Sequence, residues 1–249
     1  MKKLLSFAIS FILSATSIFS QEYKGAFAII SDIDGYTNIR NKSQQLIDKV
    51  YDHEILAIND FCVTAENYMC VDYGWNAPKG TFMRFGWGEE SYKTDNEKNG
   101  IIHSSRIKYL IDLPQLEKEI VDKKTVIFEG QDIHVEVSTG RFDVSEYENV
   151  TEDKIGNYPI WGYDGFCKCD PNPTEIKSIT FTFADQKLVF PHEALIAYLR
   201  PNVDNMYVAK ASENIYYLVM LNSDGAGGYE LVYTIKDKKL VSSIAYRNF

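Results

Sequence analysis

The stretch "DIDGYTNIR", residues 32–40, decides the fold of the first part of the chain. The stretch begins with an acidic turn that follows the apolar run "AFAII", residues 26–30. Polar and apolar residues alternate after this turn. A period of two is typical of a strand with one buried face. Residues 26–40 are therefore predicted to form a strand, a turn and a second strand, with Tyr36, Asn38 and Arg40 on one face.

Short apolar segments separated by turn signals continue as far as residue 107, which favours a small barrel or sandwich. Residues 41–53 are polar and are predicted to form a loop. The further predicted strands are 54–63 and 68–73, joined as a hairpin, "TFMRFGW" at 81–87, and "GIIHSSRI" at 100–107, which also includes a turn.

Two motifs in this region resemble the opening and closing motifs of the bacterial SH3-like domain, SH3b. The opening motif is Asp34, Gly35, Tyr36, Thr37, Asn38, Ile39 and Arg40, and the closing motif is Gly100, Ile102, His103, Ser105 and Arg106. The resemblance covers residues 26–107 and implies a small β-barrel with Ile39 inside. The chain departs from the family at "NKSQQ", where a Gly-Pro turn is usual, and at Ile101, where an aromatic residue is usual.

The same resemblance implies a role in binding, because SH3b domains often bind cell-wall peptides or act as accessory modules of wall enzymes. The candidate ligand-binding residues are Asp34, Tyr36, Asn38, Arg40, Tyr73 and Trp75. Tyr and Trp suit a groove because they combine apolar area with a polar tip. A structural interpretation stands beside this one, in which Asn38 and Arg40 fix neighbouring loops and the aromatic residues pack the barrel.

The N-terminus has the pattern of a secretory signal peptide. Lys2 and Lys3 precede an almost wholly apolar or small stretch at 4–19, and Ser20 stands at the expected cleavage position before Gln21. The apolar run is short for a transmembrane helix, and no Cys follows it as a lipid attachment point. We therefore expect residues 1–20 to be removed and the mature protein to be exported, to the periplasm or beyond, without a membrane anchor.

The charge of the chain restricts its partners. The formal net charge is −9, and it becomes about −11 when Lys2 and Lys3 are removed with the signal peptide. An acidic surface repels nucleic acid and anionic lipid, so neither is an expected partner. The expected partner is a cell-wall peptide or another envelope or secreted protein.

Four cysteines suggest disulfides in an exported protein, because their number is even. Cys62 and Cys70 flank the predicted hairpin turn, where Asn67 suits a left-handed conformation, and are expected to face each other. The pairing of Cys167 and Cys169 is less defined by the sequence. Free buried thiols and a metal site remain alternatives, although zinc usually requires a second nearby Cys or His pair.

The rest of the chain is predicted to be a linker or short helix at 108–124 and a β-rich α+β domain at 125–249. Leu116 and Ile120 have helical spacing after Pro114. The predicted strands are "TVIFE", "IHVEVST", "EIKSITFTF", "QKLVF", "MYVAKA", "IYYLVML", "YELVYTIK" and "KLVSSIAY", with a short helix at "HEALIAYL". The blocks "IWGYDGFCKCD" and "NSDGAGGYELVYTIKD" resemble C-terminal regions of uncharacterised exported bacterial proteins, which assigns no activity.

No motif in the sequence indicates catalysis or a cofactor. Cys167 lacks a following helix, His192 stands alone as a possible base, and no Gly-X-Ser-X-Gly elbow is present. "DIDG" lacks the spacing of a calcium-binding loop. We therefore expect a non-enzymatic binding protein. The alternatives are an envelope enzyme that acts on wall material through the second domain and an inhibitor or immunity-type protein directed against a secreted protein.

Overall fold

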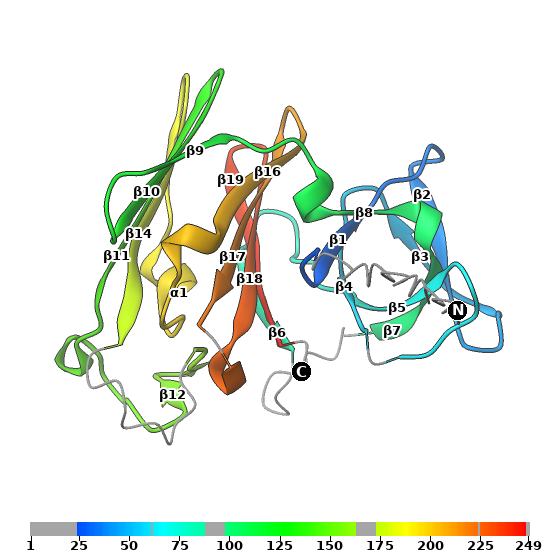
Figure 1. Cartoon of the computed structure of the whole chain (residues 1–249), viewed down its shortest axis with the longest axis horizontal. Coiled ribbons are helices and arrows are strands. Elements are labelled where there is room, and N and C mark those ends of the chain that lie inside the picture. The colour runs from blue at the N-terminus through cyan, green and yellow to red at the C-terminus, as the bar shows by residue number, and fades with distance from the viewer. Residues whose placement is uncertain (1–23, 61, 88–97, 163–172, 224, 248–249) are drawn as a thin grey trace, which may run out of the picture.

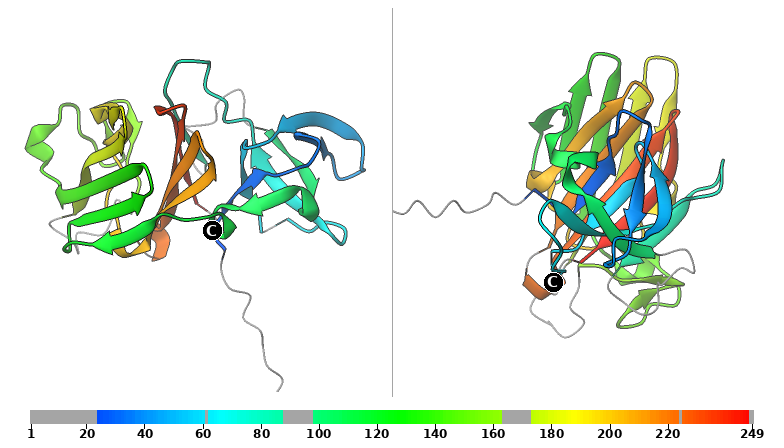
Figure 2. Two further views of the ribbon diagram at one scale, coloured as in Figure 1. Left: turned by 90° about the horizontal axis from the view of Figure 1, so that it is seen from above. Right: turned by 90° about the vertical axis from the view of Figure 1, so that its right-hand side faces the viewer.

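The structure is a computed structural model that describes residues 24–60, 62–87, 98–162, 173–223 and 225–247. Three β-layers lie side by side in the described part of the chain (Figure 1, Figure 2). The prediction of a mainly β protein is confirmed. The expected signal peptide at 1–20 and the cysteines Cys167 and Cys169 lie outside the described residues.

The first layer is an antiparallel sheet of seven strands formed by the N-terminal part of the chain. Its order is β3 (Leu46–Tyr51), β2 (Tyr36–Arg40), β7 (Lys98–His103), β5 (Tyr68–Tyr73), β4 (Ile55–Ile58), β1 (Phe27–Ile30) and β8 (Ile107–Tyr109). The predicted strand, turn and strand at 26–40 are confirmed as β1, the turn after it and β2. The predicted loop at 41–53 is wrong in part, because β3 pairs with β2 over most of its length.

The sheet curls around a small core but does not close. Its edge strands β3 and β8 do not pair with each other in the described residues, so the closure expected for a barrel is absent. Ile39 lies fully buried in this core, as predicted. Gly100 is required beside it, because a Cβ atom at that position would lie 2.2 Å from Cγ2 of Ile39. Close approach of β2 and β7 therefore depends on a residue without a side chain.

The second layer is a five-stranded sheet from the C-terminal part of the chain. Its order is β16 (Met206–Ser212), β17 (Ile215–Asn222), β18 (Tyr229–Lys236), β19 (Lys239–Tyr246) and β6 (Met83–Trp87). β6 was expected in the N-terminal barrel, and that assignment is wrong. It leaves the first sheet and pairs in parallel with β19, from Met83 opposite Ser242 to Trp87 opposite Tyr246.

The third layer is another five-stranded sheet, and it closes a sandwich against the second. Its order is β15 (Lys187–Val189), β14 (Thr174–Phe183), β11 (Ile133–Arg141), β10 (Thr125–Gly130) and β9 (Glu117–Ile120). Of the two alternatives for 108–124, a linker or a short helix, the helix proposed from Leu116 and Ile120 is wrong, because β9 is an exposed strand that pairs with β10. The short helix after Pro191 is confirmed as α1 (His192–Leu195), and the small hairpin of β12 (Lys154–Ile155) and β13 (Tyr158–Pro159) lies nearby.

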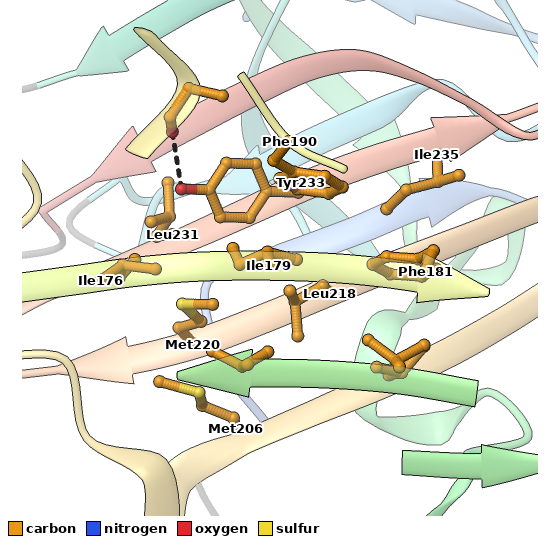
Figure 3. Packing of buried hydrophobic residues seen from close by; sticks show 14 of the residues in the cluster. Ile176, Ile179, Phe181, Phe190, Met206, Leu218, Met220, Leu231, Tyr233 and Ile235 are labelled. Carbon is orange, nitrogen blue, oxygen red and sulfur yellow. Dashed lines mark hydrogen bonds between the residues drawn. The ribbon is translucent and has the colours of Figure 1, made fainter. Parts of the chain in front are cut away.

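Two hydrophobic clusters hold the three layers together. The larger lies between the second and third sheets and includes Phe181, Leu218 and Tyr233, whose hydroxyl donates to the carbonyl oxygen of Ala194 (Figure 3). The other lies between the first and second sheets and includes Trp75, Tyr217, Val219 and Tyr246. The middle sheet is therefore buried on both faces, which explains the nearly continuous apolar sequence of β17.

The start of the described chain is also fixed to the middle sheet. The backbone N–H of Ala26 donates to the carboxylate of Glu230 on β18, at 2.9 Å from each oxygen. The hydroxyl of Tyr217 donates to the carbonyl oxygen of His53 at 2.8 Å. These polar contacts join the first and second layers in addition to the apolar cluster between them.

Candidate functional site

The strand register of the first sheet brings the predicted ligand residues to one face. Because side chains alternate along a strand, Tyr36, Asn38 and Arg40 lie on the face opposite the buried Ile39 and Thr37. Three cross-strand pairs from β5 and β7 share that face: Tyr68 with His103, Cys70 with Ile101, and Asp72 with Asn99. Arg40 lies opposite Ile101 and connects β2 to these pairs.

One end of this face is hollowed into a groove of about 320 Å³. We call it the Tyr36 groove, and it is lined by Asp32, Asp34, Tyr36, Thr37, Asn38, Arg40, Tyr68, His103, Ser105 and Arg106. Four of the six predicted ligand residues, Asp34, Tyr36, Asn38 and Arg40, therefore lie together. The groove is mixed in charge, with two carboxylates, two guanidinium groups and two tyrosine rings in its lining.

The turn between β1 and β2 shapes one wall of the groove. Gly35 has a φ of +73°, a conformation that favours glycine, and its N–H donates to the carbonyl oxygen of Asp32 at 2.9 Å. The carboxylate of Asp32 accepts from the N–H of Asp34 at 3.2 Å and pairs with Arg106 at 2.8 Å. The Asp32 side chain is buried while that of Arg106 is 44% exposed, so the guanidinium is held in position and still reaches solvent.

The basic side chains near the groove differ in how far their existing contacts occupy them. Nζ of Lys49 lies 3.2 Å from the centroid of the Tyr36 ring, a cation–π contact that covers part of the ring. Arg40 donates from one guanidinium nitrogen to the carbonyl oxygen of Gln44 at 2.8 Å. One hydrogen bond leaves other N–H groups of the Arg40 guanidinium for a ligand. The structural role considered for Arg40, fixing a loop, is thus combined with access to the groove.

His103 and Tyr68 form the other wall. The two rings meet edge to face with centroids 5.3 Å apart. Nδ1 of His103 accepts from the backbone N–H of Ser105 at 3.3 Å and lies 2.8 Å from its hydroxyl oxygen. Since Nδ1 is an acceptor here, a neutral His103 carries its proton on Nε2. His103, Ser105 and Arg106 stood in the closing motif of the sequence, but their place in the groove was not predicted, nor was that of Asp32 or Tyr68.

Tyr73 and Trp75 do not join this groove, which corrects the prediction that they line it. Tyr73 is 2% exposed, and its hydroxyl donates to Asp48 at 3.3 Å; burial raises the pKa of Tyr73. Trp75 is 6% exposed and packs edge to face with Phe27 at 6.5 Å, in the cluster between the first and second sheets. Both rings are used for packing, because each faces a core and not solvent.

The disulfide between Cys62 and Cys70 is present, with Cα atoms 5.9 Å apart. It joins β5 to the segment that follows β4, and Asn67 has the expected positive φ of +64° in the turn. The strand on the Cys62 side ends at Ile58, earlier than predicted. A second cavity, of about 570 Å³, begins at this disulfide and extends to Asp72 and Asn99 on the same face.

Neither a metal centre nor a membrane-spanning helix is found in the described part of the chain. No three His, Cys, Asp or Glu side chains among those residues are placed to hold a metal ion. None of the helices described there is long and apolar enough to cross a membrane. The face is therefore polar, is hollowed at two places and has a disulfide beside it.

Comparison with protein-family models, with curated proteins and with solved structures finds no match for this chain. The resemblance to SH3b therefore stays a prediction from the two motifs. What the site does is argued below from its own geometry.

Proposed function

We propose that this chain is an exported, non-catalytic binding protein of the bacterial cell envelope and that its Tyr36 groove holds a cell-wall peptide. The observation that carries the proposal is the convergence of Asp34, Tyr36, Asn38 and Arg40 in one groove with Arg106. The disulfide between Cys62 and Cys70 is compatible with an oxidising compartment and therefore with export.

The chemistry of the groove suits a short peptide that carries both charges. The Arg40 and Arg106 guanidinium groups pair well with carboxylates, in which wall peptides end. Asp34 is exposed at the turn and suits a free amino group. Tyr36 and Tyr68 offer apolar area with few rotatable bonds, which lowers the entropic cost of holding a ligand.

Cosedimentation of the mature chain, residues 21–249, with purified peptidoglycan sacculi tests this proposal. Tyr36→Ala and Arg40→Ala should each weaken binding about tenfold, corresponding to roughly 1–2 kcal/mol for a true anchor. Arg141→Ala removes an exposed guanidinium from β11 in the third layer and is the matched control, with binding unchanged. Thermal unfolding of each variant checks that the Arg40 loop contact is not needed for folding.

The result also separates the functional classes. An enzyme would release soluble fragments from the sacculi, whereas a binder would only pellet with them. Absence of wild-type binding at low salt would show that the cell-wall proposal is wrong.

A protein partner is the second candidate, and the edge strand β3 favours it. Leu46 and Tyr51 on this strand are 60% and 55% exposed, and β3 has one unpaired side in the described sheet. Exposed apolar residues on a free edge are typical of strand-to-strand recognition. A pull-down with secreted proteins tests it, and a retained protein should be lost with Leu46→Asp.

A further inference from the structure

Asp72 lies buried beside the second cavity, which we call the Asp72 pocket. The pocket has a volume of about 570 Å³, and Asp72, Asn99, Asn59, Ile47 and Ile101 contribute to its lining. Asp72 is 2% exposed. Its carboxylate accepts from the Tyr246 hydroxyl at 3.3 Å and from the amide of Asn59 at 3.5 Å, both long for hydrogen bonds.

This carboxylate has no cationic partner among the residues that the structure describes. Burial raises its pKa from 3.8 to about 6, so it is ionised at neutral pH in spite of its surroundings. A buried anion without a countercharge is costly. A ligand cation that replaces the missing countercharge would recover part of that cost.

We propose that the Asp72 pocket binds the ammonium group of a small aliphatic amine. The ammonium group would pair with Asp72, and the side chain of Asn99, directly opposite in the strand register, lies on the same face. Ile47 and Ile101 supply apolar walls for the alkyl part of the ligand. The disulfide fixes the segment around Cys62 to β5 at one end of this pocket, because both Cys62 and Cys70 line it.

An organic cation fits the site better than a metal ion. Calcium takes six to eight oxygen ligands and magnesium requires six in near-octahedral geometry, whereas Asp72 is a single carboxylate. No cluster of metal-ligating side chains occurs in the described ranges. An ammonium ion needs one counter-anion and a few acceptors, which this pocket provides.

The charged groups around Asp72 come from several elements. Lys42, from the loop between β2 and β3, lines the pocket but is exposed and does not pair with Asp72. Burial, followed by the charge and hydrogen bond of Asp72, raises the pKa of Tyr246 from β19, and Asp60 and Glu230 add to this rise. The Tyr246 hydroxyl therefore stays protonated over the neutral range. Asp72 is therefore the group whose titration decides cation binding between pH 5 and pH 8.

Calorimetric titration of the mature chain with isopentylamine at pH 7.5 tests the proposal, with 3-methylbutan-1-ol as the neutral probe of the same shape. The amine should bind at least tenfold more tightly than the alcohol. Asp72→Asn keeps the shape and removes the charge, so amine binding should fall to the level of the alcohol. Equal affinities of amine and alcohol, or unchanged amine binding in a folded Asp72→Asn variant, would overturn the proposal.

The wild-type protein supplies a second measurement that does not depend on the folding of the variant. Amine affinity should fall about tenfold for each pH unit below 6, because a proton then competes for Asp72. An affinity that stays constant from pH 7.5 to pH 5 would contradict the role of Asp72. Tyr36→Ala should leave amine binding unchanged, which separates this site from the peptide proposed for the Tyr36 groove.

Discussion

Replacing Asp72 by Asn should stabilise the protein at neutral pH, although it removes a hydrogen-bonded buried residue. The amide keeps an oxygen that accepts from the Tyr246 hydroxyl, and it has no charge to desolvate. The wild-type carboxylate is ionised at pH 7.5, with its pKa raised from 3.8 to about 6 by burial. The variant therefore avoids an unfavourable charged state.

The size of the effect follows from the pKa. Each pKa unit corresponds to about 1.4 kcal/mol, so the rise from 3.8 to about 6 corresponds to about 3 kcal/mol of stability at pH 7.5. The effect of ionisation on stability is opposite to that of most carboxylates in folded proteins, because folding here favours the protonated form of Asp72. The destabilisation by Asp72 is absent below the unfolded pKa of 3.8, grows as pH rises to about 6, and is constant above it.

Urea unfolding of wild type and Asp72→Asn at pH 7.5 and pH 4 measures this difference. The variant should be more stable than wild type by about 3 kcal/mol at pH 7.5 and nearly equal to it at pH 4. Weaker hydrogen bonding by the amide than by the carboxylate would reduce the gain at pH 7.5. Asp48→Asn is a control of opposite sign, because the Lys98 hydrogen bond lowers the pKa of Asp48. It should destabilise by under about 1 kcal/mol at pH 7.5 and by less in acid. A destabilising, pH-independent effect of Asp72→Asn would refute the reasoning.

Three further substitutions test the core and the disulfide of the first layer in the full mature chain. Ile39→Asp should destabilise the folded protein by more than about 4 kcal/mol and abolish its cooperative thermal transition, because it buries an unpaired charge. A wild-type-like melting curve would contradict the placement of Ile39 in the core. Gly100→Ala should lower the unfolding free energy by about 1–3 kcal/mol through overpacking against Ile39, and an unchanged urea midpoint would argue against the close approach of β2 and β7. Cys62→Ser together with Cys70→Ser should cost about 2–3 kcal/mol for so short a loop, and titration of denatured, unreduced protein should find fewer than four reactive thiols.

Local sequence patterns predicted most strands because their alternation has a local cause. The period of two correctly placed Tyr36, Asn38 and Arg40 on one face of a strand, and the apolar Ile39 on the other face is the residue that the core buries. Two turns were also predicted from local residue types. Gly35, between β1 and β2, and Asn67, before β5, both have the positive φ that their residue types favour.

The errors arose where tertiary pairing decided the outcome. Leu116 and Ile120 are four residues apart and matched a helix, but the segment runs from the second sheet to the third and its backbone pairs at both. β6 has an ordinary aromatic strand sequence that does not specify its partner, and its parallel pairing with β19 spans most of the chain. Trp75 was wrongly placed in a groove because the local sequence around it does not distinguish an exposed aromatic residue from a buried one.

The face that carries the Asp72 pocket is physically connected to the second layer through Asp72. Its hydroxyl partner, Tyr246, belongs to β19, and the ring of Tyr246 also packs against Phe27 at 5.9 Å in the cluster between the first two layers. A fragment ending at residue 107 would lose this hydroxyl and expose Phe27 and Trp75 to water. Asp72 in such a fragment would be hydrated, its pKa would return toward 3.8, and the charge that favours an amine would no longer be confined. Because the second layer creates that environment, amine binding should require the full mature chain.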